Sequence, residues 1–163
     1  MDDSRVEETL DAVMEEFRRG SDDPEAGLDI DDPAVLQLRK SCRLLEVVDS
    51  LQSANGSYTV IIKASFAAVE RTIQFSLLEK VLLAEDDYVD HETVYKRGKD
   101  AGLYGPDFRD KLITLWENNR SRTYYREGVG TATSAGLMAN LARQLHDHVF
   151  QIAGLSHECI CTW

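Results

Sequence analysis

The stretch that decides the fold is residues 57–84, SYTVIIKASFAAVERTIQFSLLEKVLLA. Apolar side chains recur in it every three or four residues, in one line formed by Ile62, Phe66, Val69, Ile73, Leu77 and Val81. Further apolar residues widen this line around much of the helix, which is typical of a central, buried helix. A helix over all 28 residues would be about 42 Å long.

The flanking sequence repeats the helical period. Residues 33–54, 106–119 and 131–153 each carry an inward apolar line, and residues 91–100 suit a short helix. Asp32-Pro33 and Gly154 are typical of a helix start and a helix end. Alternation with a period of two is absent, so we expect an all-α bundle of four to five long helices. In residues 4–19 the apolar residues would lie on one side of a helix and the acidic residues on the opposite side, which predicts an extra N-terminal helix.

Charge divides the chain into two predicted units. Residues 1–32 hold thirteen acidic and three basic residues, whereas residues 33–163 hold sixteen and fifteen. We therefore expect an acidic N-terminal helix and linker over 1–32 and a helical-bundle domain over 33–163. Within that domain, residues 91–126 carry a local charge of +3, which leaves room for an anion site despite the overall −11.

Composition narrows the class of protein further. Twelve Arg against six Lys, with abundant Asp, resembles the composition of haloarchaeal proteins. No apolar run reaches the roughly 20 residues that span a bilayer, and the start lacks the blocks of a signal peptide. Three cysteines give no disulfide framework. We expect a cytoplasmic protein without a membrane role.

A basic and aromatic hinge lies between two predicted helices, at residues 116–126, WENNRSRTYYR. Arginine binds phosphate through two parallel hydrogen bonds, and tyrosine stacks on bases. The hinge therefore predicts a site for RNA or a nucleotide, formed by Arg120, Arg122, Tyr124, Tyr125 and Arg126. Alternatively, these arginines pair with nearby acids such as Glu117 and Glu127 and only solvate a loop.

Two motifs resemble those of HEPN domains, which are helical bundles of prokaryotic toxins and RNA-targeting nucleases. One is the pattern Ala-x-x-Glu-Arg ending in Leu77-Leu78, and the other is Arg120-Ser121 before the last helix. The resemblance spans roughly residues 33–153 and implies a homodimer with a cleft shared by two subunits. It also implies a metal-independent RNase centre in which the candidates are Arg120, the residue at position 125 and Glu70, which would orient an arginine.

The chain departs from that pattern at Tyr125, which stands where the family has histidine. A phenol titrates near pH 10 and cannot replace imidazole as a base at neutral pH. We therefore expect RNA or nucleotide binding with little or no RNase activity. A second hypothesis is a dimeric protein-interaction module without a nucleic-acid role. In that case the acidic helix of residues 4–19 would dock on a partner protein or fold over its own cleft.

The tail offers three candidates for a metal site, His157, Cys159 and Cys161. A Cys-x-Cys pair lies at the edge of the spacing that zinc favours, and Cys42 is a candidate third thiolate, but no second ligand pair is evident. We therefore expect no metal and no cofactor, and a tail that docks through its apolar residues. His146 and His148 lie about 200° apart on a helix and cannot share one ion, so we expect core or solvated histidines.

Overall fold

A computed structural model of the chain describes residues 4–20, 23–84, 87, 89–120, 128–154 and 159–161. The helices in these ranges are α1 (Ser4–Arg19), α2 (Pro33–Ser53), α3 (Tyr58–Glu79), α4 (His91–Asp100), α5 (Pro106–Asn119) and α6 (Ala132–Ala153). No strand occurs in these ranges, so the all-α prediction is confirmed. None of the helices described is both long and apolar enough to cross a bilayer.

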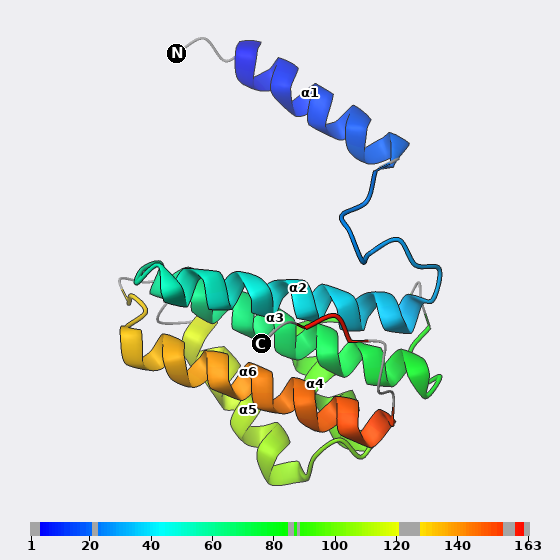
Figure 1. Cartoon of the computed structure of the whole chain (residues 1–163), viewed down its shortest axis with the longest axis vertical. Coiled ribbons are helices and arrows are strands. Elements are labelled where there is room, and N and C mark those ends of the chain that lie inside the picture. The colour runs from blue at the N-terminus through cyan, green and yellow to red at the C-terminus, as the bar shows by residue number, and fades with distance from the viewer. Residues whose placement is uncertain are drawn as a thin grey trace.

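The centre of the bundle is α3, which packs mainly against α2 and α6 and more lightly against α4 (Figure 1). Its side chains Phe66, Val69, Ile73 and Phe75 are at most 2% exposed and form the middle of the core. The expectation that residues 57–84 supply the central helix is therefore correct in its main part. This arrangement sets α2 and α6 on two sides of α3.

Local sequence fixes the ends of the two helices that flank α3. The Asp32 side chain accepts hydrogen bonds from the backbone N–H groups of Ala34 (2.9 Å) and Val35 (3.1 Å), so it caps α2 ahead of Pro33. Thr131 and Ser134 cap α6 reciprocally. Gly154 ends α6 in the left-handed conformation at φ +67°. These boundaries hold the register of α2 and α6.

The central helix is shorter than predicted. It ends at Glu79, and Leu82 N–H then donates to Leu77 C=O (2.8 Å) while Val81 takes a positive φ of +56°. Val81, expected to continue the buried line, is 86% exposed. With 22 residues, α3 spans about 33 Å rather than 42 Å. Leu115 and Ile152, also expected to face inward, are exposed.

The N-terminal helix stands away from the bundle (Figure 1). None of its residues is buried, and its predicted apolar stripe faces solvent: Val6, Leu10, Val13, Met14 and Phe17. The sequence correctly placed this helix at residues 4–19. The division into units at residue 32 stays a prediction.

Candidate metal centre

Four metal-ligating side chains from three segments meet at one point. Cys42 comes from α2, His146 from α6, and Cys159 and Cys161 from the C-terminal tail. Their potential ligand atoms all lie within 4.8 Å of one another. In Figure 1 the tail, drawn in red, passes between α2 and α6 at this point. The fold thus brings together residues more than one hundred positions apart in the chain.

The distances between the ligand atoms show how closely the four side chains approach. Cys42 Sγ lies 3.4 Å from Cys159 Sγ and 2.8 Å from Cys161 Sγ. His146 Nε2 lies 3.8 Å from Cys42 Sγ, 3.3 Å from Cys159 Sγ and 3.2 Å from Cys161 Sγ. One nitrogen of the imidazole therefore faces all three sulfurs.

This geometry fits a tetrahedral zinc ion better than a disulfide. Zn–S bonds of about 2.3 Å and Zn–N bonds of about 2.0–2.1 Å place neighbouring ligand atoms about 3.5–3.8 Å apart. Five of the six separations are 2.8 to 3.8 Å and all six lie within 4.8 Å, so movements of about 1 Å bring the ligand atoms to these values. A disulfide needs sulfurs at about 2.05 Å, and it would leave the third cysteine of the cluster unpaired.

Two buried hydroxyl groups determine which ring nitrogen of His146 carries the proton. Ser41 donates to the carbonyl of Ala68 (3.0 Å), and Ser41 Oγ lies 2.7 Å from Thr72 Oγ1. Because the Ser41 proton is used, the Thr72 hydroxyl donates to Ser41. His146 Nδ1, at 3.3 Å from both hydroxyl oxygens, must then be the donor. The lone pair of Nε2 therefore points at the sulfurs, as a metal ligand requires.

The thiols also differ in acidity before any metal binds. Hydrogen bonds from Cys161 and Cys42 lower the pKa of Cys159. The hydrogen bond to Cys159, together with burial, raises the pKa of Cys42 to about 12. The cluster thus holds one favoured thiolate, Cys159, to begin metal capture, and binding must displace protons from the other two sulfurs.

The ligand set determines what such a centre can do. Cys42 and His146 are buried, and the two tail cysteines are partly buried. Four protein ligands complete a tetrahedral shell and leave no position for water or substrate, which is the hallmark of a structural zinc site. The chemistry available is therefore cross-linking of the chain rather than activation of water.

The tail that carries two of the ligands also touches the linker before α2. Ile160, between the two cysteines, lies so close to Gly27 that a Cβ at Gly27 would stand 2.9 Å from its Cδ1. Arg39 Nη1 donates to the Gly27 carbonyl (3.1 Å), and Arg43 binds the Ala26 carbonyl. The ligand segment, α2 and the linker thus form one contiguous surface.

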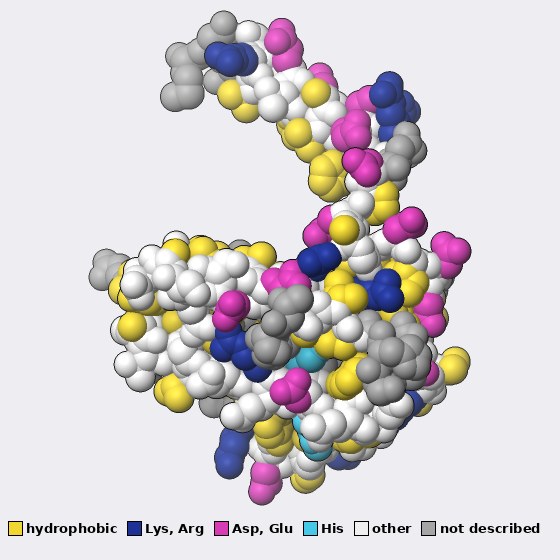
Figure 2. All heavy atoms as spheres, in the orientation of Figure 1, with side chains coloured by type: hydrophobic (Ala, Val, Ile, Leu, Met, Phe, Trp, Pro, Cys, Tyr) yellow, Lys and Arg dark blue, Asp and Glu magenta, His cyan; other side chains and the backbone are white. Residues whose placement is uncertain are grey.

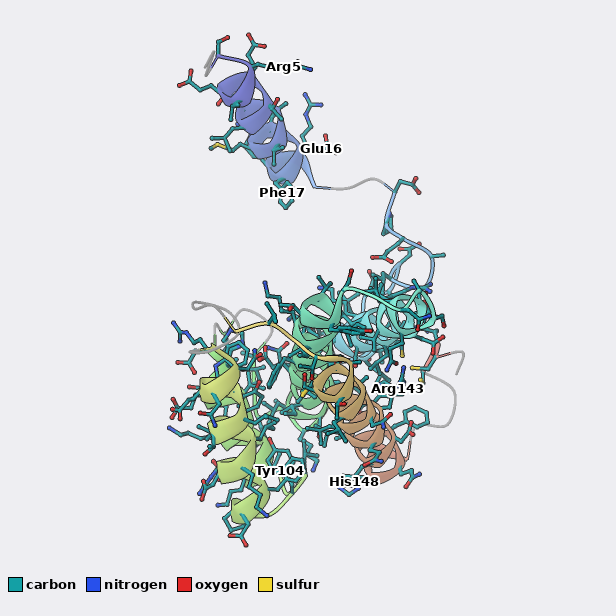
Figure 3. All side chains as sticks on the ribbon, turned by 90° about the vertical axis from the view of Figure 1, so that its left-hand side faces the viewer. Arg5, Glu16, Phe17, Tyr104, Arg143 and His148 are labelled. Atoms are coloured by element: carbon teal, nitrogen blue, oxygen red, sulfur yellow. The ribbon has the colours of Figure 1, made fainter. Side chains whose placement is uncertain are left out.

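Sequence analysis found only part of this centre. It named Cys159 and Cys161 as candidate ligands, with Cys42 as a candidate third thiolate, but it expected no metal and did not place His146 with them. His157 lies outside the described residues. His148, labelled in Figure 3, instead binds the Leu103 carbonyl (2.9 Å), so the two histidines of α6 have different hydrogen-bond partners. A signal for His146 was available, because its i−4 neighbour Ala142 and i+3 neighbour Val149 are core positions.

Glu70, predicted to orient an arginine, is hydrogen-bonded to other side chains within the chain, and its predicted role in a dimer cleft stays a prediction. It accepts hydrogen bonds from His91 Nδ1 (2.5 Å) and from the buried Tyr95 hydroxyl (2.8 Å). Burial and the charge of Glu70 raise the pKa of Tyr95, so its hydroxyl remains a donor. The adjacent Arg71 donates to the amide oxygens of Gln37 (3.2 Å) and Gln74 (2.8 Å). Glu70 thus orients an imidazole in these contacts.

The predicted phosphate site falls mostly outside the described part of the chain. Arg120 is the C-cap of α5. Arg122, Tyr124, Tyr125 and Arg126 lie in residues 121–127, which the structure does not describe. The site at this hinge therefore stays a prediction.

The chain belongs to the family described as Domain of unknown function (DUF8154), whose model matches residues 1–161. The match includes α1, the linker and both tail cysteines, so the metal ligands all lie within the family domain. No curated protein and no solved structure shows significant similarity to the chain. The resemblance to HEPN domains is tested by none of these comparisons and stays a prediction.

Proposed function

We propose that this member of the DUF8154 family binds one structural zinc ion through Cys42, His146, Cys159 and Cys161. The observation that carries the proposal is the convergence of the four ligand atoms within 4.8 Å, with His146 Nε2 facing the three sulfurs. Zinc is favoured over harder cations because thiolate and imidazole are its preferred ligands.

The role of this zinc is to fasten the C-terminal tail to the bundle. The tail has no regular secondary structure at residues 159–161, and its ligands reach α2 and α6 at once. Such an ion cross-links three segments, and its binding free energy adds to the folding free energy. The protein is then a zinc-organised helical module, which agrees with an interaction role rather than with metal catalysis.

Zinc content measured on two matched variants tests the proposal. His146→Gln removes a ligand, whereas His148→Gln changes a histidine two residues away on the same helix that binds a backbone carbonyl instead. After purification without metal-binding tags, we expect one zinc per chain in the wild type and in His148→Gln. His146→Gln is expected to lose most of it, as is Cys161→Ser.

Cobalt substitution supplies the second readout. The wild-type protein should show the intense visible bands and the sulfur-to-cobalt charge transfer of a tetrahedral thiolate site. Equal metal content in both histidine variants, or a wild-type protein without metal after zinc reconstitution, would overturn the proposal. In that case the cluster is a set of hydrogen-bonded thiols.

Binding of RNA or a nucleotide at the Arg120 hinge is a separate prediction from the sequence. Its test is the double variant Arg120→Ala with Tyr125→Phe, which should abolish binding of a labelled RNA oligonucleotide or nucleotide. Binding that the double variant leaves unchanged, or none by the wild type, counts against that prediction. Either result leaves the zinc proposal untouched.

A further inference from the structure

The apolar stripe of α1 is exposed to solvent in the structure. Phe17 is 84% exposed, and four other large apolar side chains on the same side are each about half exposed or more: Val6, Leu10, Val13 and Met14. In Figure 3, Phe17 points from α1 toward the side on which the bundle lies. A 16-residue helix is marginal by itself in water, so its stability must come from packing this stripe against a surface.

A groove of matching character lies on the outer side of α2. Its volume is about 930 Å³, and its apolar floor is formed by Leu44, Val47 and Leu51. Lys40, Arg43 and Arg71 line it as well, together with Glu25 and Glu46, which both pair with Arg43 (3.7 and 2.6 Å). Figure 2 shows hydrophobic and basic side chains together on this face, where the linker joins the body. The length of α2 from Lys40 to Leu51 is about 18 Å, against about 24 Å for α1.

The charged residues that line the groove, three basic and two acidic, leave a net charge of +1, which favours an acidic occupant. The excess comes from Lys40 and Arg71, because Arg43 is paired with Glu25 and Glu46. Burial and then the charge of Arg71 lower the pKa of Lys40. Arg71 itself is hydrogen-bonded to the amide oxygens of Gln37 and Gln74, which are uncharged. The polar side of α1 is acidic, with Glu7, Glu8, Asp11, Glu15 and Glu16 against three arginines. An acidic helix with an apolar stripe therefore suits both the apolar and the basic residues that line the groove.

We propose that the α1 helix of one protomer lies in the α2 groove of a second copy of the chain, and that two copies exchange these helices about a two-fold axis. The linker of each chain is held at the edge of its own groove, because Glu25, Ala26 and Leu28 line the groove and Arg43 binds Glu25 (3.7 Å) and the Ala26 carbonyl. From there α1 leaves its own body (Figure 1). Exchange of a terminal element buries two stripes and two grooves in one isologous interface.

Trans-complementation of the full-length chain tests this exchange. One variant, Leu10→Glu with Phe17→Glu, disables the helix, and another, Val47→Glu, disables the groove at a residue that is 48% exposed. Each variant alone should dimerise at least about 30-fold more weakly than the wild type, as expected for the loss of an interface hot spot. An equimolar mixture should regain a heterodimer, because one intact helix and one intact groove remain.

Light scattering and sedimentation give the masses, and circular dichroism confirms that each variant keeps its helices. The control Lys111→Gln, at an exposed residue of α5 that lies outside both α1 and the groove lining, should dimerise like the wild type. A monomeric wild type at all concentrations overturns the proposal, as does a dimer that the helix variant leaves unchanged. A mixture that stays monomeric also overturns it, because that result means each helix folds onto its own groove.

Discussion

At the scale of single residues, His146 links the core to the surface cluster. One of its ring nitrogens is held by the buried hydroxyl groups of Ser41 and Thr72, and the other faces three sulfurs. Hydrogen-bond partners of this kind fix the orientation of a ligating imidazole and raise its affinity for metal.

Thr72→Val therefore tests the partner of the ligand without touching a ligand. The variant keeps the shape of the side chain but removes its hydroxyl, so the proton on Nδ1 loses one acceptor. We expect zinc affinity to fall about 10- to 100-fold, as for other outer partners of ligating histidines. Competition with a chromophoric chelator measures this change.

A buried serine on the same helix provides the control for that experiment. Ser65 donates to the Ile61 carbonyl (2.7 Å) within α3 and has no contact with the cluster among its hydrogen bonds. Ser65→Ala should leave zinc affinity unchanged. If Ser65→Ala lowers affinity as much as Thr72→Val does, the effect is general destabilisation and not orientation of His146.

At the scale of elements, the start of α6 is set by its contact with α3. The Gly130 N–H donates to Thr59 Oγ1 (3.0 Å), and a Cβ at Gly130 would stand 2.8 Å from the Thr59 backbone nitrogen. Because backbone atoms cannot move aside as a flexible side chain can, only glycine allows this approach. The register of α6, and with it the position of His146 along the bundle axis, depends on this junction.

Two glycine substitutions near the start of α6 should have opposite effects. Gly130→Ala forces backbone against backbone and should lower the free energy of unfolding by about 1–3 kcal/mol, as overpacking does. Gly136→Ala lies within the helix with open space around the new methyl group, and it should raise stability by about 0.5–1 kcal/mol. Denaturant unfolding measures both, and equal effects of the two would contradict the junction described here.

The sequence predicted the helices better than it predicted the site. Boundaries marked by local chemistry, such as Asp32-Pro33 and Gly154, were found because capping needs only neighbouring residues. The end of α3 was missed, because Val81 and Leu82 continue the apolar period but leave the helix through a turn. The centre was missed in part because Cys42 and His146 meet the tail only through tertiary packing, which no spacing rule records.

At the scale of the whole molecule, the metal centre and the N-terminal arm are connected through the linker. The proposed zinc ligands Cys159 and Cys161 flank Ile160, which lies against Gly27, and Arg39 and Arg43 hold the same linker segment. The apolar cluster around α3 is formed by residues other than these ligands, so its own contacts do not include the ion. Metal binding is therefore expected to order one side of the protein more than the other.

Removal of the metal should loosen the linker and the tail selectively. After chelation we expect faster amide hydrogen exchange at residues 23–30 and 159–161. The proposed zinc ion holds the tail against the bundle, and the tail in turn contacts the linker. Exchange in α4 and α5 should change little, because these helices pack away from the cluster. Exchange that rises uniformly through the chain would mean that the ion supports the whole fold. Exchange rates that stay the same at residues 23–30 and 159–161 would mean that the ion holds neither segment in place.

The central claim is a zinc ion held by three thiolates and one imidazole, and X-ray absorption at the zinc edge of the purified full-length protein tests it most directly. The predicted spectrum has a shell of three sulfurs at about 2.3 Å and one nitrogen at about 2.0–2.1 Å. A shell of oxygen and nitrogen ligands without sulfur, or a protein that takes up no zinc at all, would contradict the account.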